Sequence, residues 1–228
     1  MPEWAYGKHE MNKQIVAVAA AAFFGFALPA SAWAQTSPAA GPVSAQAAAE
    51  ETPEALVGRV STEVVDLVKG DKAIQAGDVG KVIALVDSKV MPHVNMQRMT
   101  AGAVGRAWRE ATPVQRTKLQ DEFKILLVRT YAGALAQVKD QNVTVRPSRG
   151  KPEAETLVRT EIRGRGEPIQ LDYRLERSDK GWKIYDLNVL GIWVVQTYQT
   201  QFAAEINKSG VDGLIAALVA RNKAAAAK

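Results

Sequence analysis

The stretch IQLDYRLERSDKGWKIYDLNVLG, residues 169–191, decides the fold class. Apolar side chains occupy every second position from residue 169 to residue 175 and alternate with polar and charged ones. Successive side chains of a strand point to opposite faces, so this pattern predicts a strand with one dry face. The turn-rich residues RSDKG, 177–181, separate it from a second predicted strand, 182–189. A connection this short implies antiparallel pairing.

Two more strands are predicted before this stretch, at residues 143–146 and 157–162, separated by the turn-rich segments RPSRGKPE and RGRGEP. The chain therefore contains an antiparallel sheet of about four strands. Apolar residues recur at helical spacing before and after this meander. Helices, then strands, then helices again make an α+β arrangement.

Local signals mark the predicted helices of the first half. Pro53 suits the first position of a helix that Gly70 ends, and Asp78 can cap a second helix that stops before Pro92. The clearest start is TPVQ, residues 112–115, where a threonine cap is followed by proline and, three residues after the cap, by glutamine. An apolar stripe then runs for about 25 residues, so we predict one long helix that backs the sheet.

The segment that follows the last strand carries no charge between Asp186 and Glu205. On a helical wheel its apolar side contains Val195, Tyr198, Phe202 and Ile206. We interpret the segment as a strand end that turns at Gly191 into an amphipathic helix with an uncharged polar side. Two residues do not fit this wheel: Gln199 falls on the apolar side and Trp193 on the polar side.

The N-terminal residues predict export. Residues 11–35 read MNKQIVAVAAAAFFGFALPASAWAQ, with one lysine, an apolar run and then small residues. This is the layout of a signal peptide cleaved after Ala34, and Met11 is itself a suitable start. A membrane anchor is the disfavoured alternative, because about 14 apolar residues are too few to span a bilayer comfortably. Without any cysteine the chain lacks the attachment residue of a lipoprotein, so we expect a protein free in the periplasm.

Composition divides the chain into a signal peptide (1–34), a disordered leader rich in Ala, Pro, Ser and Gly (35–52), one domain (53–222) and a tail (223–228) that either frays or extends the last helix. Removal of residues 1–34 takes away Lys8, Lys13, Glu3 and Glu10, so the net charge stays at +5. About 190 residues are enough for one domain with a substantial core.

Few residues suggest chemistry. The mature chain has one histidine, His93, and no nearby spacing supplies the other ligands of a zinc site or the partners of a catalytic triad. We therefore expect no catalytic residue, no metal and no cofactor. Candidates for acid/base work are Asp172, Tyr173, Tyr185 and Asp186, although roles in a strand face or a turn are more common for such residues.

Basic residues are in modest excess around the strands. Residues 146–183 contain ten Lys or Arg and seven Asp or Glu. Surfaces that bind nucleic acid usually show a denser basic patch with interleaved aromatic residues, so we expect no nucleic-acid ligand. Either these residues solvate the outer face of the sheet, or they attract acidic lipid headgroups or an acidic partner surface.

Three blocks of sequence carry a family resemblance. They are VDSKVMPHVNMQRMTAGAVGRAWREATPVQRTKLQDEF (86–123), IQLDYRLERSDKGWKIYDLNVLG (169–191) and QTYQTQFAAEINKSGVDGLIAAL (196–218). In this order they strongly resemble the MlaC family, also called the toluene-tolerance auxiliary or phospholipid-binding proteins. The resemblance extends over residues 56–219.

The resemblance implies a periplasmic phospholipid carrier that is not an enzyme. Such a carrier shuttles phospholipid between an outer-membrane lipoprotein and porin complex and an inner-membrane Mla-type ABC transporter complex, and so maintains outer-membrane lipid asymmetry. The implied fold is similar to the nuclear-transport-factor cone: a curved antiparallel sheet wrapped by helices around an apolar lipid cavity, in a monomer. The family often has an acidic residue and a serine where this chain has Leu190 and Trp193, which makes this turn more apolar.

Apolar residues of the strands and helices are predicted to line a slot for acyl chains. They are Val104, Trp108, Leu126, Leu127, Tyr131, Ile169, Leu171, Tyr173, Leu175, Leu187, Val189, Val195, Tyr198 and Phe202. Leu190 and Trp193 are predicted as a pocket rim or partner contact, with an ordinary packed turn as the alternative. Apolar periodicity does not distinguish a filled core from a lined cavity, so a packed core is the equal alternative for each lining residue.

Two other functions remain as alternatives. One is a carrier of the same fold for another apolar envelope lipid, such as a hopanoid. The other is a small-molecule enzyme that uses Tyr185 or Asp186.

Overall fold

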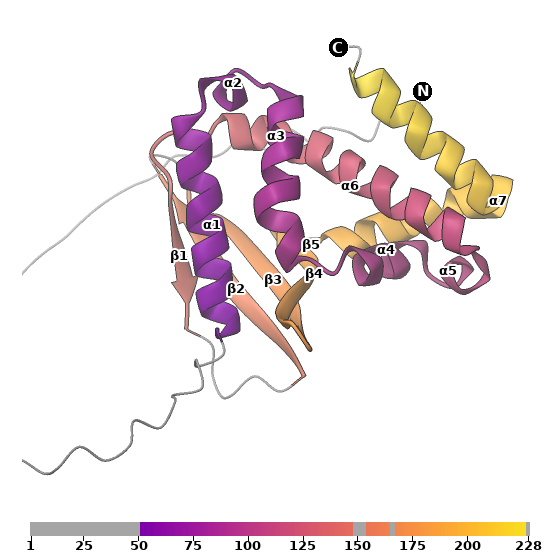
Figure 1. Ribbon diagram of the computed structural model, residues 1–228, viewed down its shortest axis with the longest axis horizontal. Coiled ribbons are helices and arrows are strands. Elements are labelled where there is room, and N and C mark those ends of the chain that lie inside the picture. The colour runs from indigo at the N-terminus through magenta and orange to yellow at the C-terminus, as the bar shows by residue number, and fades with distance from the viewer. Residues whose placement is uncertain (1–50, 148–153, 165–166, 227–228) are drawn as a thin grey trace, which may run out of the picture. The chain divides into compact units, whose positions relative to one another are not determined.

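The strands that the alternation predicts form one antiparallel sheet. In the computed structural model, which describes residues 51–147, 154–164 and 167–226, the strand order is β1-β2-β3-β4-β5 (Figure 1). The strands are β1 (Asn142–Arg146), β2 (Glu155–Arg163), β3 (Ile169–Ser178), β4 (Gly181–Val189) and β5 (Ile192–Trp193). There are five strands and not the four expected, because β5 has only two residues and is too short to show alternation. The predicted signal peptide and most of the predicted leader lie outside the described residues.

The register assigns the side chains to two faces of the sheet. Leu171 of β3 lies opposite Thr160 of β2 and Val189 of β4. Residues directly opposite one another share a face, so the apolar side chains of the central strands lie together. Asp172 of β3 and Arg159 of β2 are paired on the other face. We call the face of Leu171 the inner face and the face of Asp172 the outer face.

One irregularity interrupts the pairing of β3 with β4. Arg174 pairs with Asp186, but the next residue, Leu175, pairs with Ile184, so Tyr185 is an extra residue in β4. A bulge of this kind bends the strand and increases its twist. Because of this extra residue, Ile184 lies on the inner face, opposite Leu175.

α-Helices precede and follow the sheet along the chain. They are α1 (Pro53–Gly70), α2 (Lys72–Gln75), α3 (Val79–Leu85), α4 (Met96–Val104), α5 (Ala107–Glu110), α6 (Pro113–Ala136) and α7 (Val194–Ala226). Of these, α1, α4 and α7 make the closest contacts with the strands. α1 has the predicted bounds, with Thr52 as its cap, and packs on β1 and β2 (Figure 1). A methyl group at Gly58 would lie 3.2 Å from Val145 Cγ2, so α1 approaches β1 closely at this glycine.

The second predicted helix changes character along its length. Asp78 caps α3 by accepting a hydrogen bond from Lys81 N–H at 3.1 Å. The α-helical part ends at Leu85 and continues as a π-helical turn (Val86–Val90) and a 3-10 turn (Met91–His93). Pro92 lies near the start of the 3-10 turn, where an N–H group would have no hydrogen-bond partner within the turn, so proline is accepted there.

The long helix α6 begins as predicted. Gln115 N–H donates to Thr112 Oγ1 at 3.2 Å, and Thr112 N–H donates back to Gln115 Oε1 at 2.9 Å. α6 packs mainly against α3, α4 and α7, and it faces the sheet through an apolar cluster that Leu187 and Val189 of β4 also contact. Helices α4 and α7 make the contacts with β4.

The segment after β4 contains a tight turn before its helix. Leu190 and Gly191 have positive φ angles of 52° and 88°, and β5 then pairs back onto β4. Trp193 therefore lies in β5, which explains why it did not fit the helical wheel. α7 begins at Val194, kinks at Gly210 and extends through the predicted tail to Ala226.

Two apolar cores matter for the site. The helical core lies among α4, α5, α6 and α7 and contains Met99, Ala103, Val104, Trp108, Leu119, Phe123, Leu126, Val194, Tyr198, Phe202, Leu214, Ile215 and Leu218. The sheet core lies between α1 and the inner face and contains Leu56, Val57, Val60, Val158, Leu175, Trp182 and Ile184. A third cluster joins α1, α2 and α3 to α6.

Candidate functional site

Most of the predicted lining residues meet in or beside the helical core. The buried ones are Val104, Trp108, Leu126, Tyr198 and Phe202. Leu127, Tyr131, Leu187, Val189 and Val195 are partly buried and pack against the same core. The fold therefore brings together side chains from α4, α5, α6, α7 and β4 that are far apart in the sequence.

An aromatic group forms the centre of the helical core. The Phe123 ring lies edge-on to Tyr198 and Phe202, with centroid distances of 5.0 and 5.2 Å. Phe123 is fully buried and joins α6 to α7. Such edge-to-face contacts add stability beyond the buried area, so this group is a packed core.

Two predicted residues belong to the sheet core instead. Leu175 is fully buried there, and Tyr173 packs against its edge. The Tyr173 hydroxyl lies 3.2 Å from Ser61 Oγ of α1, and burial raises the pKa of Tyr173. Ser61 was missed by the sequence analysis, because a single serine in a helix gives no periodic signal.

Burial of the inner face changes across the sheet. Val158 and Leu175 have no exposed surface, whereas Leu171, Leu187 and Val189 are only half-buried. Strands covered on one face by helices usually bury that face fully. We call the exposed part the half-buried strip, defined by Val143, Ile162, Leu171, Tyr173, Leu187 and Val189. Sequence reasoning did not place Val143 and Ile162 in the site, although their alternation with polar neighbours was visible.

The remaining predicted residues lie outside both cores. Ile169 is 42% exposed at the start of β3, and Leu190 is 65% exposed in the turn before β5. Trp193 is half-buried on the outer face, where the Arg174 guanidinium lies 3.8 Å from its ring centroid. Ile169 is at the end of the inner face, opposite Ile162, whereas Leu190 and Trp193 are not brought together with the other predicted lining residues.

Asp186 fixes the start of α7 to the sheet. Its Oδ1 accepts hydrogen bonds from Leu187 N–H at 2.8 Å and from Val195 N–H at 3.1 Å, and its Oδ2 accepts one from Arg174 at 3.2 Å. Burial raises the pKa of Asp186, while the backbone bonds and Arg174 oppose that rise. The neighbouring Tyr185 hydroxyl donates to Glu155 at 2.8 Å. Tyr185 and Asp186, the two residues of the enzyme alternative, therefore have structural roles.

A polar clasp joins the start of α4 to the sheet. Arg98 donates to Glu155 Oε1 at 2.6 Å and also to Glu176. Asn95 donates its side-chain amide to Glu176 and its N–H to the carbonyl oxygen of Ile184, the latter at 2.8 Å. Charge-assisted hydrogen bonds are among the stronger ones, so the clasp sets the position of α4 over the edge of β4.

Other regions offer no competing centre within residues 51–147, 154–164 and 167–226. No group of three His, Asp or Glu side chains there could hold a metal ion, and no helix there has the length and apolar composition to span a bilayer. Clefts of about 660, 480 and 350 Å³ border α1, and the described residues that line them include none of the predicted ones. His93 lines the smallest cleft, where burial, helped by Arg59 and Lys183, lowers its pKa.

Comparison with known proteins decides the family. The family model described as MlaC protein matches residues 58–220. This chain belongs to the MlaC family. The matched MlaC region contains the whole sheet, helices α2 to α6 and most of α1 and α7.

Two relatives and one solved structure are also similar to this MlaC-family chain. The toluene tolerance protein ttg2D of Pseudomonas putida is 27% identical over 166 residues, which cover 72% of this chain and 77% of the relative. The intermembrane phospholipid transport system binding protein MlaC of Haemophilus influenzae is 22% identical over 178 residues, covering 76% and 83%. The phospholipid-binding protein of Ralstonia solanacearum, solved in complex with a phospholipid, is 44% identical with a TM-score of 0.73, covering 76% of this chain and 98% of that one. The predicted α+β fold of the family is confirmed.

Proposed function

We propose that this MlaC-family chain is a phospholipid carrier, with acyl chains held between the inner face of the sheet and the helical core. The observation that carries the proposal is the half-buried strip. Leu171, Leu187 and Val189 are apolar and lie on paired strands under helices, yet they keep exposed surface. Leaving apolar surface in water is unfavourable, so an apolar ligand that covers the strip is the simplest explanation. The bound phospholipid of the Ralstonia relative supports the same assignment.

Burial divides the predicted lining residues into two groups under this proposal. Fully buried side chains such as Leu175 and Leu126 form the packed core, because neighbouring protein atoms already surround them. Partly buried side chains contact the acyl chains. The tail-contacting group is Leu127, Tyr131, Leu171, Tyr173, Leu187, Val189 and Val195. This group faces the ligand from α6, α7, β3 and β4.

The physics of transfer explains why such a carrier needs no catalytic group. Each methylene that enters water costs about 0.8 kcal/mol, so two long acyl chains cost on the order of 20 kcal/mol or more. A protein cavity in which the acyl chains have a free energy similar to that in the membrane lowers this barrier, while the charged headgroup stays in water. Net direction then depends on the difference in affinity between carrier, donor and acceptor, with ATP consumed elsewhere.

The carrier works in the periplasm under this proposal, after removal of the predicted signal peptide. Its donor and acceptor are the outer-membrane lipoprotein and porin complex and the inner-membrane Mla-type ABC transporter complex. The intermembrane transport role in the name of the Haemophilus relative supports this assignment. Another apolar envelope lipid remains the alternative cargo.

A transfer assay tests the carrier proposal. Donor vesicles contain a phospholipid with a self-quenched fluorophore, and acceptor vesicles contain none. We expect the delipidated chain to increase the rate of dequenching in proportion to its concentration. A rate that equals the spontaneous one at every protein concentration contradicts the proposal. Competition with unlabelled phospholipid and with a hopanoid then identifies the preferred cargo.

A further inference from the structure

Exposed apolar side chains gather at one end of the sheet. Ile169, Leu190 and Ile192 are 42%, 65% and 62% exposed. Ile192 pairs with Val189 of β4, and Leu190 N–H donates to the carbonyl oxygen of Gln170, the neighbour of Ile169, at 3.1 Å. The three side chains therefore come from adjoining strand ends. We call Ile169, Leu190 and Ile192 the apolar end.

Leu190 occupies a backbone conformation that does not suit leucine. Its φ is 52°, and it is the one non-glycine residue with positive φ within the described part of the chain. Gly191 follows with φ 88°, so the pair forms the kind of two-residue hairpin turn that favours asparagine, aspartate or glycine at both positions. Neither backbone preference nor packing in the folded chain explains an exposed leucine here.

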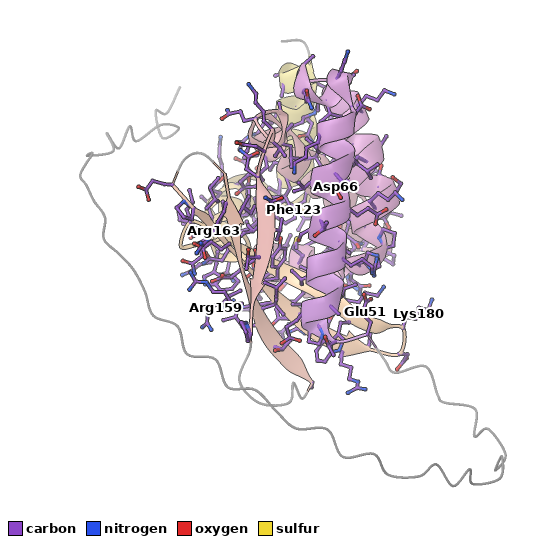
Figure 2. All side chains as sticks on the ribbon, turned by 90° about the vertical axis from the view of Figure 1, so that its left-hand side faces the viewer. Glu51, Asp66, Phe123, Arg159, Arg163 and Lys180 are labelled. Carbon is purple, nitrogen blue, oxygen red and sulfur yellow. The ribbon has the colours of Figure 1, made fainter. Side chains whose placement is uncertain are left out.

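Arginines lie on the outer face of β1 and β2, and Arg163 is at the same end of the sheet as the apolar end. Arg146 of β1 lies directly opposite Arg159 of β2, and like charges in that position repel. Arg146 and Arg163 share one carboxylate, Glu161, at 3.0 and 3.1 Å. The two guanidinium side chains are 57% and 65% exposed, whereas the Glu161 side chain is 12% exposed. The surface that meets solvent is therefore positive, on the side of the strands away from α1 (Figure 2).

The arginines and the apolar end are neighbours. Arg163 ends β2 next to Ile162, which is paired with Ile169 of the apolar end. Neighbouring strands lie about 4.8 Å apart, so the strand of Arg163 and the strand that leads to Leu190 are about 10 Å apart. Ile169 and Ile192 are on the inner face, because they pair with Ile162 and Val189, whereas Arg163 is on the outer face. All of them lie at the same end of the sheet, so a flat object that meets this end can contact the apolar side chains and Arg163.

We infer that the apolar end and the outer-face arginines form a docking surface for an anionic lipid membrane. Apolar side chains that enter the interface, together with basic side chains that meet phosphate groups, are the two components of reversible membrane binding. The charge alone attracts weakly and is screened by salt, and the apolar end supplies the contact that salt does not screen. A carrier that exchanges lipid only through protein complexes does not require such a surface, so this inference goes beyond the proposed function.

Vesicle flotation tests the inference with one matched pair of variants. Vesicles of phosphatidylglycerol and phosphatidylcholine are compared with vesicles of phosphatidylcholine alone. Leu190→Asn suits the positive φ and keeps the fold, but we expect it to lower binding to the anionic vesicles about tenfold, because the apolar insertion is lost. Val114 on α6 is also 65% exposed, so Val114→Asn is the control and binds like wild type.

Charge variants test the other half of the surface. Arg159→Gln weakens binding to anionic vesicles and reduces its salt dependence. Arg106→Gln, which removes a 92% exposed guanidinium on the connection between α4 and α5, leaves binding unchanged. Glu167→Gln removes an exposed carboxylate two residues before Ile169 and strengthens binding.

Three results would overturn the inference. They are wild-type protein that does not float with anionic vesicles, equal binding by Leu190→Asn and Val114→Asn, and a dimer in sedimentation that Leu190→Asn converts to a monomer. The last result assigns the surface to a second copy of the chain. Lipid extraction from the same wild-type sample tests the carrier proposal separately. Protein that contains lipid but does not bind vesicles contradicts only the docking inference. Protein that binds vesicles but contains no lipid contradicts only the carrier proposal.

Discussion

Gly102 of α4 lies so close to Val195 of α7 that a methyl group at Gly102 would be 2.8 Å from Val195 Cγ1. Real carbon atoms do not approach this closely, so the two helices can be in contact here only because Gly102 has no side chain. Val195 also belongs to the proposed tail-contacting group, and its N–H is bonded to Asp186 of β4. The contact therefore sets the distance between α4 and one wall of the proposed slot.

Gly102→Ala is expected to lower the free energy of unfolding by about 1–3 kcal/mol, because the added methyl forces α4 and α7 apart. Urea denaturation followed by circular dichroism measures the change. The control is Gly133→Ala on the exposed side of α6, where no atom lies within 4 Å of the added carbon. That change should be stabilising by about 0.5–1 kcal/mol, as alanine is the better helix former. Equal stability of the two variants contradicts the close packing of α4 on α7.

Leu171→Trp is expected to reduce the amount of phospholipid that co-purifies while the fold is kept. Leu171 is half-buried on the inner face, so a larger side chain there fills space that the proposed acyl chain uses. Phosphate analysis of the extracted lipid gives the load, and circular dichroism checks the fold. Thr144→Trp places the same ring on the outer face of β1 and should leave the load unchanged. A full load in Leu171→Trp removes Leu171 from the proposed site.

Removal of the lipid should separate lining residues from core residues. We expect the methyl NMR signals of Leu171, Leu187 and Val189 to shift on delipidation, because their surroundings change from acyl chain to water or to a collapsed slot. The methyl signals of Val158 and Leu175, which protein atoms already surround, should shift much less. Uniform shifts across both groups argue against a localised slot along the half-buried strip.

Delipidation should also lower the thermal midpoint, since a ligand that binds only the folded state stabilises it.

The clasp at Arg98 should make stability depend on pH in the acid range. The Arg98 guanidinium, aided by the Tyr185 hydroxyl, holds the pKa of Glu155 below its ordinary value. Because the pKa is lower in the folded state, this contribution is present above the ordinary value and is lost as the pH falls through the folded-state pKa. Glu155→Gln should therefore lower the thermal midpoint at pH 7 and flatten its decline on acidification. Tyr185→Phe should also lower the thermal midpoint at pH 7 and flatten its decline on acidification, but by smaller amounts. Parallel midpoint curves for wild type and Glu155→Gln contradict the role of the clasp.

Local signals allowed the sequence to predict much of the fold. Alternation from Ile169 onward predicted the central strands, Pro53 placed the start of α1, and the cap Thr112 placed the start of α6. These features depend on neighbours in sequence, which a single chain displays. β5 was missed because two residues cannot establish a period, and it exists only because the turn at Leu190 returns the chain to β4.

The site was harder to predict than the fold. Leu171 and Leu175 are equivalent in the alternating pattern, yet one is half-buried and the other is fully buried under α1. That difference depends on which helix covers which part of the sheet, and periodicity does not encode it. The position of Trp193 likewise depends on Arg174, which lies nineteen residues earlier on a different strand.

Lipid extraction and mass identification from the purified mature chain, made in a host that contains membranes, is the most direct test of whether this chain carries phospholipid. We expect phospholipid in a fixed molar ratio to protein, present also as a bound species in native mass spectra. Ligand-free protein in every such preparation, with no uptake when phospholipid is offered to it, would show that the chain is not a phospholipid carrier.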